Sequence, residues 1–232
     1  MPLQTLAISM SDDTRAHLKD GGYSLYVFRP VASSNKTGVP LVWARLDPES
    51  YFSNIPVAFE TEMFCAYISN DAIAVDATIG IGTSIAASPG QTAGVDAVGR
   101  MTATMAAPLD SIYIASTAAT SYSCGLAAKF GSLAATPFCA FTLYPEGLVT
   151  MQPANALFVM WATSAYDPGV FMRQSLGPGL LVHFDDSTPR AVTYDITEAW
   201  QAGQAAWAQP IGSGTVLTSI LISDPGRNHP DR

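Results

Sequence analysis

The residues best suited to acid–base chemistry stand near the end of an apolar run. Residues 180–182 are apolar, His183 follows them, and Asp185 and Asp186 come next. Alternate side chains of a strand share a face, so His183 and Asp185 are expected to point the same way. An imidazole beside a carboxylate can act as a general base or bind a metal. The alternative interpretation is a strand that runs into a turn stabilised by its aspartates.

Asp195 is a further candidate, and Glu198 lies close to it in sequence. Two carboxylates held across a cleft can hydrolyse a glycosidic bond. The alternative is that Thr197 and Glu198 begin a short helix. His183, Asp185 and Asp195 are therefore the candidate catalytic residues of one hypothesis, an enzyme that acts on a small molecule in a cavity of a β scaffold.

Motifs of high specificity are absent from the sequence. Gly80 and Gly82 do not form a dinucleotide-binding loop, because residue 85 is Ile and no helix is expected after it. No G-x-S-x-G pentapeptide is present. The three cysteines are too widely spaced for a disulfide framework or a compact zinc site. We expect no metal and no cofactor.

Aromatic residues beside turns indicate binding instead. Tyr51, Tyr144 and Tyr166 each stand directly before a turn-forming segment (52–54, 145–147 and 167–169). Aromatic side chains on loops of a β scaffold offer flat apolar faces with a polar tip, which suit sugar rings or lipid headgroups. The leading hypothesis is thus a non-enzymatic, lectin-like or membrane-interacting protein that recognises a glycan or a lipid-like surface. Its predicted binding residues are Tyr51, Tyr144, Tyr166, Asp167 and Asp186.

Short strand-like segments must position these residues. They are rich in β-branched and aromatic types and are separated by Pro, Gly, Asn, Asp and Ser. This spacing predicts an all-β fold, a large antiparallel β-sandwich with a barrel as second choice, over a single domain of residues 1–232. The segments cover residues 5–10, 23–31, 40–46, 55–69, 72–80, 97–105, 110–117, 122–129, 136–143, 148–152, 156–163, 169–175, 179–184, 189–196 and 215–222.

Helical signals are few. A helix is predicted over 12–20, because Ser11 can cap it, its first residues are acidic and two glycines follow it. A second short helix is predicted over 196–208, where Trp200 and Trp207 lie seven residues apart. Residues 80–96 and the tail from Asp224 are expected to be loops.

Composition limits the partners. The 232 residues carry a net charge of −8, and no basic stripe is visible, which argues against nucleic-acid binding. Only 13% of residues are charged, so a third hypothesis is an assembly subunit that forms homo-oligomers. No signal peptide and no apolar run long enough for a transmembrane segment is recognised. The expected location is cytoplasmic, or secreted without a cleaved signal peptide.

Overall fold

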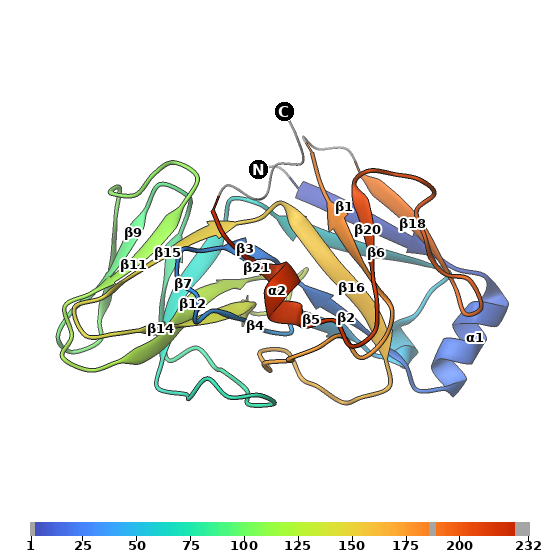
Figure 1. Cartoon of the computed structure of the whole chain (residues 1–232), viewed down its shortest axis with the longest axis horizontal. Coiled ribbons are helices and arrows are strands. Elements are labelled where there is room, and N and C mark those ends of the chain that lie inside the picture. The colour runs from blue at the N-terminus through green and yellow to red at the C-terminus, as the bar shows by residue number, and fades with distance from the viewer. Residues whose placement is uncertain (1–2, 186–188, 226–232) are drawn as a thin grey trace.

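The computed structural model describes residues 3–185 and 189–225. As predicted, the fold is all-β: short strands form four sheets, and the helices of the described segments are short (Figure 1). The molecule is elongated, with two pairs of sheets side by side along its long axis (Figure 1). Each sheet is named below after one of its strands.

The half that contains the N-terminal strand holds two sheets. The β1 sheet, in the order β19-β18-β1-β6, consists of β1 (Leu3–Ser9), β6 (Asn54–Glu60), β18 (Arg190–Asp195) and β19 (Ala199–Gln201). The β16 sheet, in the order β20-β17-β16-β2-β5, consists of β2 (Ser24–Phe28), β5 (Ala44–Leu46), β16 (Ala156–Ala162), β17 (Gly179–His183) and β20 (Ala208–Ile211).

The other half also holds two sheets. The β11 sheet, in the order β10-β9-β11-β15-β3-β21, consists of β3 (Val31–Ala32), β9 (Thr92–Val95), β10 (Met101–Thr104), β11 (Ile112–Ser116), β15 (Leu148–Pro153) and β21 (Ile222–Ser223). The β12 sheet, in the order β4-β14-β12-β7-β8, consists of β4 (Val39–Pro40), β7 (Phe64–Ser69), β8 (Thr83–Ala87), β12 (Tyr122–Ala128) and β14 (Cys139–Leu143), and β13 (Thr136–Pro137) pairs with β12.

Most neighbouring strands run antiparallel, as a sandwich requires. In the described segments, β1 and β18, β9 and β11, and β3 and β21 run parallel instead. One cluster of buried apolar residues fills the space between the sheets of both halves, from Leu6 and Val159 to Ile114 and Leu126. We call this cluster the main core. Because it is continuous, the two halves share a single packed interior.

Two of the four sheets are also covered on their outer faces. Phe158 and Met160 of the β16 sheet pack on its outer side against residues that include Leu217 and Leu221 of the short helix α2 (Leu217–Leu221). Tyr67 and other residues of the β12 sheet pack against Ile79 and Phe171 from long connections. These connections leave one end of the outer face of the β12 sheet uncovered, and the candidate site lies there.

The helix α1 (Asp12–Asp20) forms as predicted. The Ser11 side chain accepts a hydrogen bond from the backbone N–H of Thr14, Asp12 and Asp13 occupy the first turn, and Gly21 follows the last residue. These features satisfy free N–H groups and complement the helix dipole. A single turn of 3-10 helix also lies over Pro48–Ser50.

Arg29 lies where the chain passes from one half to the other, between β2 and β3. Its side chain is buried, and its Cζ lies 4.9 to 5.1 Å from the ring centroids of Trp43, Phe59, Phe64 and Phe138. Its Nη2 donates to the backbone oxygen of Glu60 at 3.0 Å. Burial lowers the pKa of the guanidinium to about 9. The rings stabilise a cation that has little access to water.

Several predicted elements differ from the structure. Residues 80–96 are not one loop, because they contain β8 and β9. Residues 196–208 form no helix: they contain β19, and Ala199 and Gly203 have positive φ angles, 60° and 63°, that a right-handed helix excludes. The predicted strand over 215–222 is largely α2. The segment 72–80 also lacks a regular strand, although Thr78 forms an isolated bridge with Val170.

Candidate functional site

An open hollow of about 290 Å³ lies at one end of the outer face of the β12 sheet. We call it the hydroxyl hollow. Its volume is close to the lower end of the range for small-ligand sites. Most of its lining side chains carry a hydroxyl, amide or carboxylate group. The lining residues are Ser69, Asn70, Asp71, Ala72, Ile73, Ser121, Tyr122, Ser123 and Thr142.

Strand register brings the hydroxyl groups together. Ser123 of β12 pairs with Thr142 of β14 on one side and with Ser69 of β7 on the other. Paired residues share a face of the sheet, so the three side chains form a row. The next residues along these strands, Cys124, Phe141 and Ile68, point into the main core. The row therefore faces away from the main core.

Asp71 is held firmly in the wall of the hollow. Its Oδ2 accepts hydrogen bonds from the Ser69 hydroxyl at 2.9 Å and from the Gly80 backbone N–H at 2.8 Å. Its own backbone N–H donates to the Ser69 hydroxyl at 3.2 Å. Its Oδ1 has no hydrogen-bond partner in the described part of the chain. The carboxylate is thus fixed in position with one oxygen left for a ligand.

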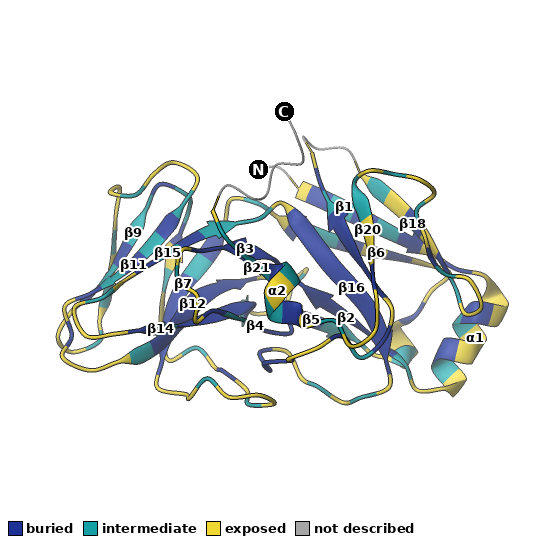
Figure 2. Ribbon diagram, viewed as in Figure 1, coloured by how far each residue is buried: buried dark blue, intermediate teal, exposed yellow. Residues whose placement is uncertain are grey.

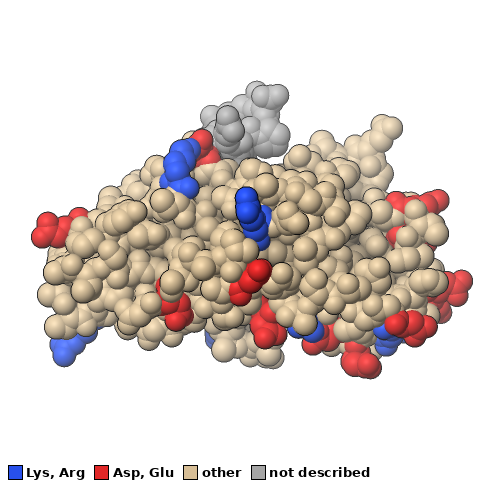
Figure 3. Space-filling view, turned by 60° about the horizontal axis from the view of Figure 1, so that its bottom comes forward, with Lys and Arg blue, Asp and Glu red and all other residues tan. Residues whose placement is uncertain are grey.

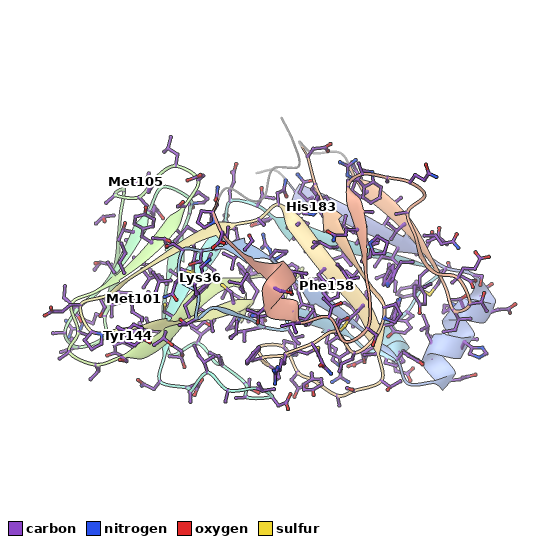
Figure 4. The ribbon with its side chains drawn as sticks, in the orientation of Figure 1. Lys36, Met101, Met105, Tyr144, Phe158 and His183 are labelled. Carbon is purple, nitrogen blue, oxygen red and sulfur yellow. The ribbon has the colours of Figure 1, made fainter. Side chains whose placement is uncertain are left out.

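Tyr144 lies just past the strand that supplies Thr142. It is 57% exposed and directly follows the end of β14 (Figure 4). The Gly147 N–H donates to the Tyr144 carbonyl at 3.0 Å, and Glu146 has a φ of 55°, so a tight turn fixes this position. Strand alternation continued from Thr142 places Tyr144 on the side of the hollow. The ring of Tyr122 packs against the main core instead.

Tyr166 and Asp167, also predicted to bind ligand, belong to another surface network. Asp167 is exposed and lies 3.5 Å from Nη1 of Arg45. The Tyr166 N–H donates to the Tyr26 hydroxyl at 3.1 Å. A hydrogen bond with the Asp76 side chain raises the pKa of Tyr166. These groups hold the connection after β16 in place, and the residues that line the hydroxyl hollow do not include them.

Tyr51, also predicted to bind ligand, is buried in the structure. Tyr51 is 2% exposed, and its ring packs edge-on against Trp161 with centroids 4.9 Å apart. Its hydroxyl donates to the backbone oxygen of Tyr23, and burial raises its pKa. A side chain enclosed in this way offers no surface to a ligand. Asp186 lies outside the described residues.

The candidate catalytic residues are held in separate structural roles. His183 ends β17 in the β16 sheet, and its burial lowers its pKa. Asp185 forms an ion pair with Arg190 at 2.6 Å. Arg190 and Asp195 mark opposite ends of β18, which puts about 16 Å of strand between them. The structure therefore pairs Asp185 with Arg190 and does not unite it with Asp195 in one cluster.

Asp195 stabilises a turn. Its Oδ1 accepts from the Thr197 hydroxyl at 2.6 Å and from the Thr197 N–H at 2.8 Å, and its Oδ2 accepts from the Thr14 hydroxyl at 3.2 Å. The hydrogen bond from the Thr197 hydroxyl is the main reason that the pKa of Asp195 falls to about 2. Such a carboxylate is a poor general acid or base near neutral pH. Among the described residues, no group of three His, Cys, Asp or Glu side chains could hold a metal ion.

Sequence reasoning missed the hydroxyl hollow. The sequence contained a weak signal for the polar lining. Ser121 and Ser123 alternate with an aromatic and an apolar residue. The polar residues Ser69, Asn70 and Asp71 follow an apolar segment. The three segments are far apart in sequence, and only strand register brings them together.

No protein-family model, curated protein or solved structure matches the chain. In the described part of the chain, neither helix has the length and apolarity needed to cross a membrane.

Proposed function

We propose that the protein binds a glycan in the hydroxyl hollow without acting on it chemically. The observation that supports this proposal is the row of Ser69, Ser123 and Thr142 beside the fixed carboxylate of Asp71. The Ser69 hydroxyl donates to Asp71 and the Ser123 hydroxyl donates to the Ser69 backbone oxygen, so these two groups face a ligand as acceptors. A sugar hydroxyl can donate to them, and the Thr142 hydroxyl can donate or accept. Asp71 Oδ1 is an acceptor for a sugar O–H, and a hydrogen bond to a charged group is stronger than one between neutral groups.

Tyr144 supplies the apolar contact that a sugar ring requires. The C–H groups of a pyranose pack well against a flat aromatic face. Tyr144 is 57% exposed and lies two residues after Thr142, although it is not itself one of the residues that line the hollow. The polar lining favours a glycan over a lipid tail, because an acyl chain would make no hydrogen bond to Asp71 Oδ1 or to the Thr142 hydroxyl. The hollow is open and small, so we expect it to hold one or two sugar units.

A glycan-array screen followed by calorimetric titration of the best ligand tests this proposal. Thr142→Val removes a hydroxyl while keeping the side-chain shape, and Asp71→Asn keeps an acceptor for the Gly80 N–H but removes the charge. If the groups bond directly to the ligand, Thr142→Val should lose about 0.5–1.5 kcal/mol, a weakening of up to about tenfold, and Asp71→Asn about 1.5–3 kcal/mol, a weakening of about tenfold or more. Thr5→Val, at a half-buried position of β1 in the other half of the molecule, is the matched control and should bind as the unaltered protein does.

Two results would contradict the proposal. One is an array on which no glycan binds at micromolar protein concentration. The other is binding that Thr142→Val and Asp71→Asn leave unchanged. Circular dichroism and thermal unfolding of each variant establish that a loss of binding does not reflect a loss of structure.

A further inference from the structure

We propose that the outer face of the β11 sheet is a contact surface between two copies of this chain. Strand register arranges eight outward residues in two rows that cross β10, β9, β11 and β15. The first row is Thr104, Thr92, Tyr113 and Thr150. The second row is Thr102, Gly94, Ala115 and Leu148. We call this surface the two-row face.

The two-row face is open. The residues that alternate with it in β9, β11 and β15, such as Ala93, Ile114 and Val149, are at most 1% exposed and belong to the main core. Every member of the two rows is half-buried or exposed, and Leu148 is 54% exposed. Connections of the same chain cover the outer face of the β16 sheet and much of that of the β12 sheet. In the described residues, Ser34 reaches this face with its hydroxyl 2.9 Å from that of Thr150, and no apolar cluster like those over the other two sheets lies on it.

The absence of charge on the two-row face favours a second copy of this chain as the partner. None of the eight residues carries a charge near neutral pH, whereas the chain as a whole has a net charge of −8. Two copies with the same net charge repel each other, and an uncharged contact surface adds no further local repulsion. A nucleic acid or an anionic lipid would require basic side chains there. Threonine hydroxyls donate and accept hydrogen bonds, so a face rich in threonine is complementary to itself across a two-fold axis.

The outer face of the β1 sheet is less suited to self-association. It is also open, but Glu60 and Asp195 lie on it, as strand alternation from Leu3 and Thr193 shows. Acidic groups brought close to their own copies across a two-fold axis are destabilising. On the face that Figure 3 shows, acidic side chains gather toward the end of the molecule near α1, and the half that contains the β11 sheet carries scattered charges of both signs.

The size of the surface is sufficient for a weak dimer. Four strands and the turns at their ends extend over about 20 Å by 25 Å, a projected area of about 500 Å². Exposed apolar side chains lie in the segments at both ends of these strands: Met105 is 70% exposed (Figure 4), and Val98 and Leu109 are 73% and 84% exposed. The same segments also carry the charged residues Asp96, Arg100 and Asp110. Stable interfaces bury about 800 Å² on each partner. The two-row face is smaller than this and falls in the size range of weak, transient interfaces, so we expect a dissociation constant in the micromolar range.

Sedimentation velocity from about 1 to 200 μM protein, a range that spans micromolar dissociation constants, tests the proposal. The protein should pass reversibly from monomer to dimer. Thr102→Lys and Tyr113→Lys each place a charge on the two-row face, and each should weaken dimerisation at least about tenfold, because a desolvated unpaired charge costs several kcal/mol. Thr193→Lys, an exposed strand position of the β1 sheet, is the matched control and should dimerise normally.

Two outcomes overturn the inference: a protein that remains monomeric at the highest concentration, and oligomers that persist in both lysine variants. Thermal unfolding of each variant shows whether it is folded, and Thr104→Lys, at an exposed position of the edge strand β10, replaces either variant that is not. Glycan binding is measured on the same samples, so the two proposals succeed or fail separately.

Discussion

The β16 sheet and the β11 sheet differ in what covers them. Every residue of β2 and β16 is buried, because the main core lies on one face and a second apolar cluster with α2 lies on the other (Figure 2). In β9 and β11, buried and half-buried residues alternate (Figure 2). The first sheet is a scaffold, and the second presents a surface. The long connections, more than the strands themselves, decide which faces can meet a partner.

The largest expected difference between the two sheets is in the cost of losing an aromatic ring. Phe158 lies in β16 with its ring centroid 5.7 Å from that of Phe28 (Figure 4). Phe158→Ala should lower the free energy of unfolding by about 3–5 kcal/mol, since it leaves a cavity in a packed layer. Tyr113→Ala, on the two-row face, should cost less than about 1 kcal/mol. Chemical denaturation of both variants measures this difference. An equal loss in the free energy of unfolding for the two variants would mean that Tyr113 is packed as tightly as Phe158 and that the two-row face is not open.

Two strand glycines provide a finer comparison. A Cβ at Gly179 of β17 would lie 2.3 Å from the Phe158 ring, so Gly179→Ala should cost about 1–3 kcal/mol through overpacking. A Cβ at Gly94 of β9 would meet its nearest atom, the Thr102 hydroxyl, at 3.5 Å, which is an ordinary contact. Gly94→Ala should therefore be neutral or stabilising by up to about 1 kcal/mol, because it restricts the unfolded chain. Thermal unfolding midpoints of the pair check this, and a destabilising Gly94→Ala would contradict it.

The smallest expected effect is a pH dependence at the end of the covered sheet. Burial lowers the pKa of His183 below 6.5, so the unfolded chain takes up this proton at a higher pH than the folded chain does. The free energy of unfolding consequently falls as the pH falls below about 6.5. His183→Gln should flatten this slope between about pH 5 and 7, measured by urea denaturation at several pH values. His17→Gln, at an exposed position of α1, corrects for the general effect of losing an imidazole. A slope that does not change in His183→Gln would show that His183 titrates alike in both states.

Much of the fold could be predicted because its signals are local. Ser11, the acidic first turn and Gly21 specify α1 without help from distant residues. The uninterrupted apolar run of β16 also specifies a buried strand. The hairpin of β9 and β10 was partly missed, because its outward residues are Thr and Gly and its inward ones include Ala, so the hydrophobic alternation is faint. Trp200 and Trp207 mimic a helical spacing, but Trp200 is fixed by packing against Trp161 and Tyr194.

The candidate site was much less predictable than the fold. A tyrosine beside a turn can point inward or outward, and Tyr51 and Tyr144 show both results. The neighbouring side chains decide which tyrosine is buried. Trp161 packs against the ring of Tyr51, whereas Tyr144 remains 57% exposed. The row of Ser69, Ser123 and Thr142 depends on the register between three strands, which no single segment encodes. His183 and Asp185 looked catalytic because they are close in sequence, but Arg190 from another strand neutralises Asp185.

The most direct test of the central claim, that the hydroxyl hollow is a glycan site, is an NMR titration of the isotope-labelled protein with the best glycan from the array. Amide resonances of residues 69–73, 121–123 and 142 should shift together with one dissociation constant, and those of Tyr166 and Asp167 should not move. Shifts confined to the neighbourhood of Tyr166 and Asp167, or no saturable shift in residues 69–73, would contradict the claim.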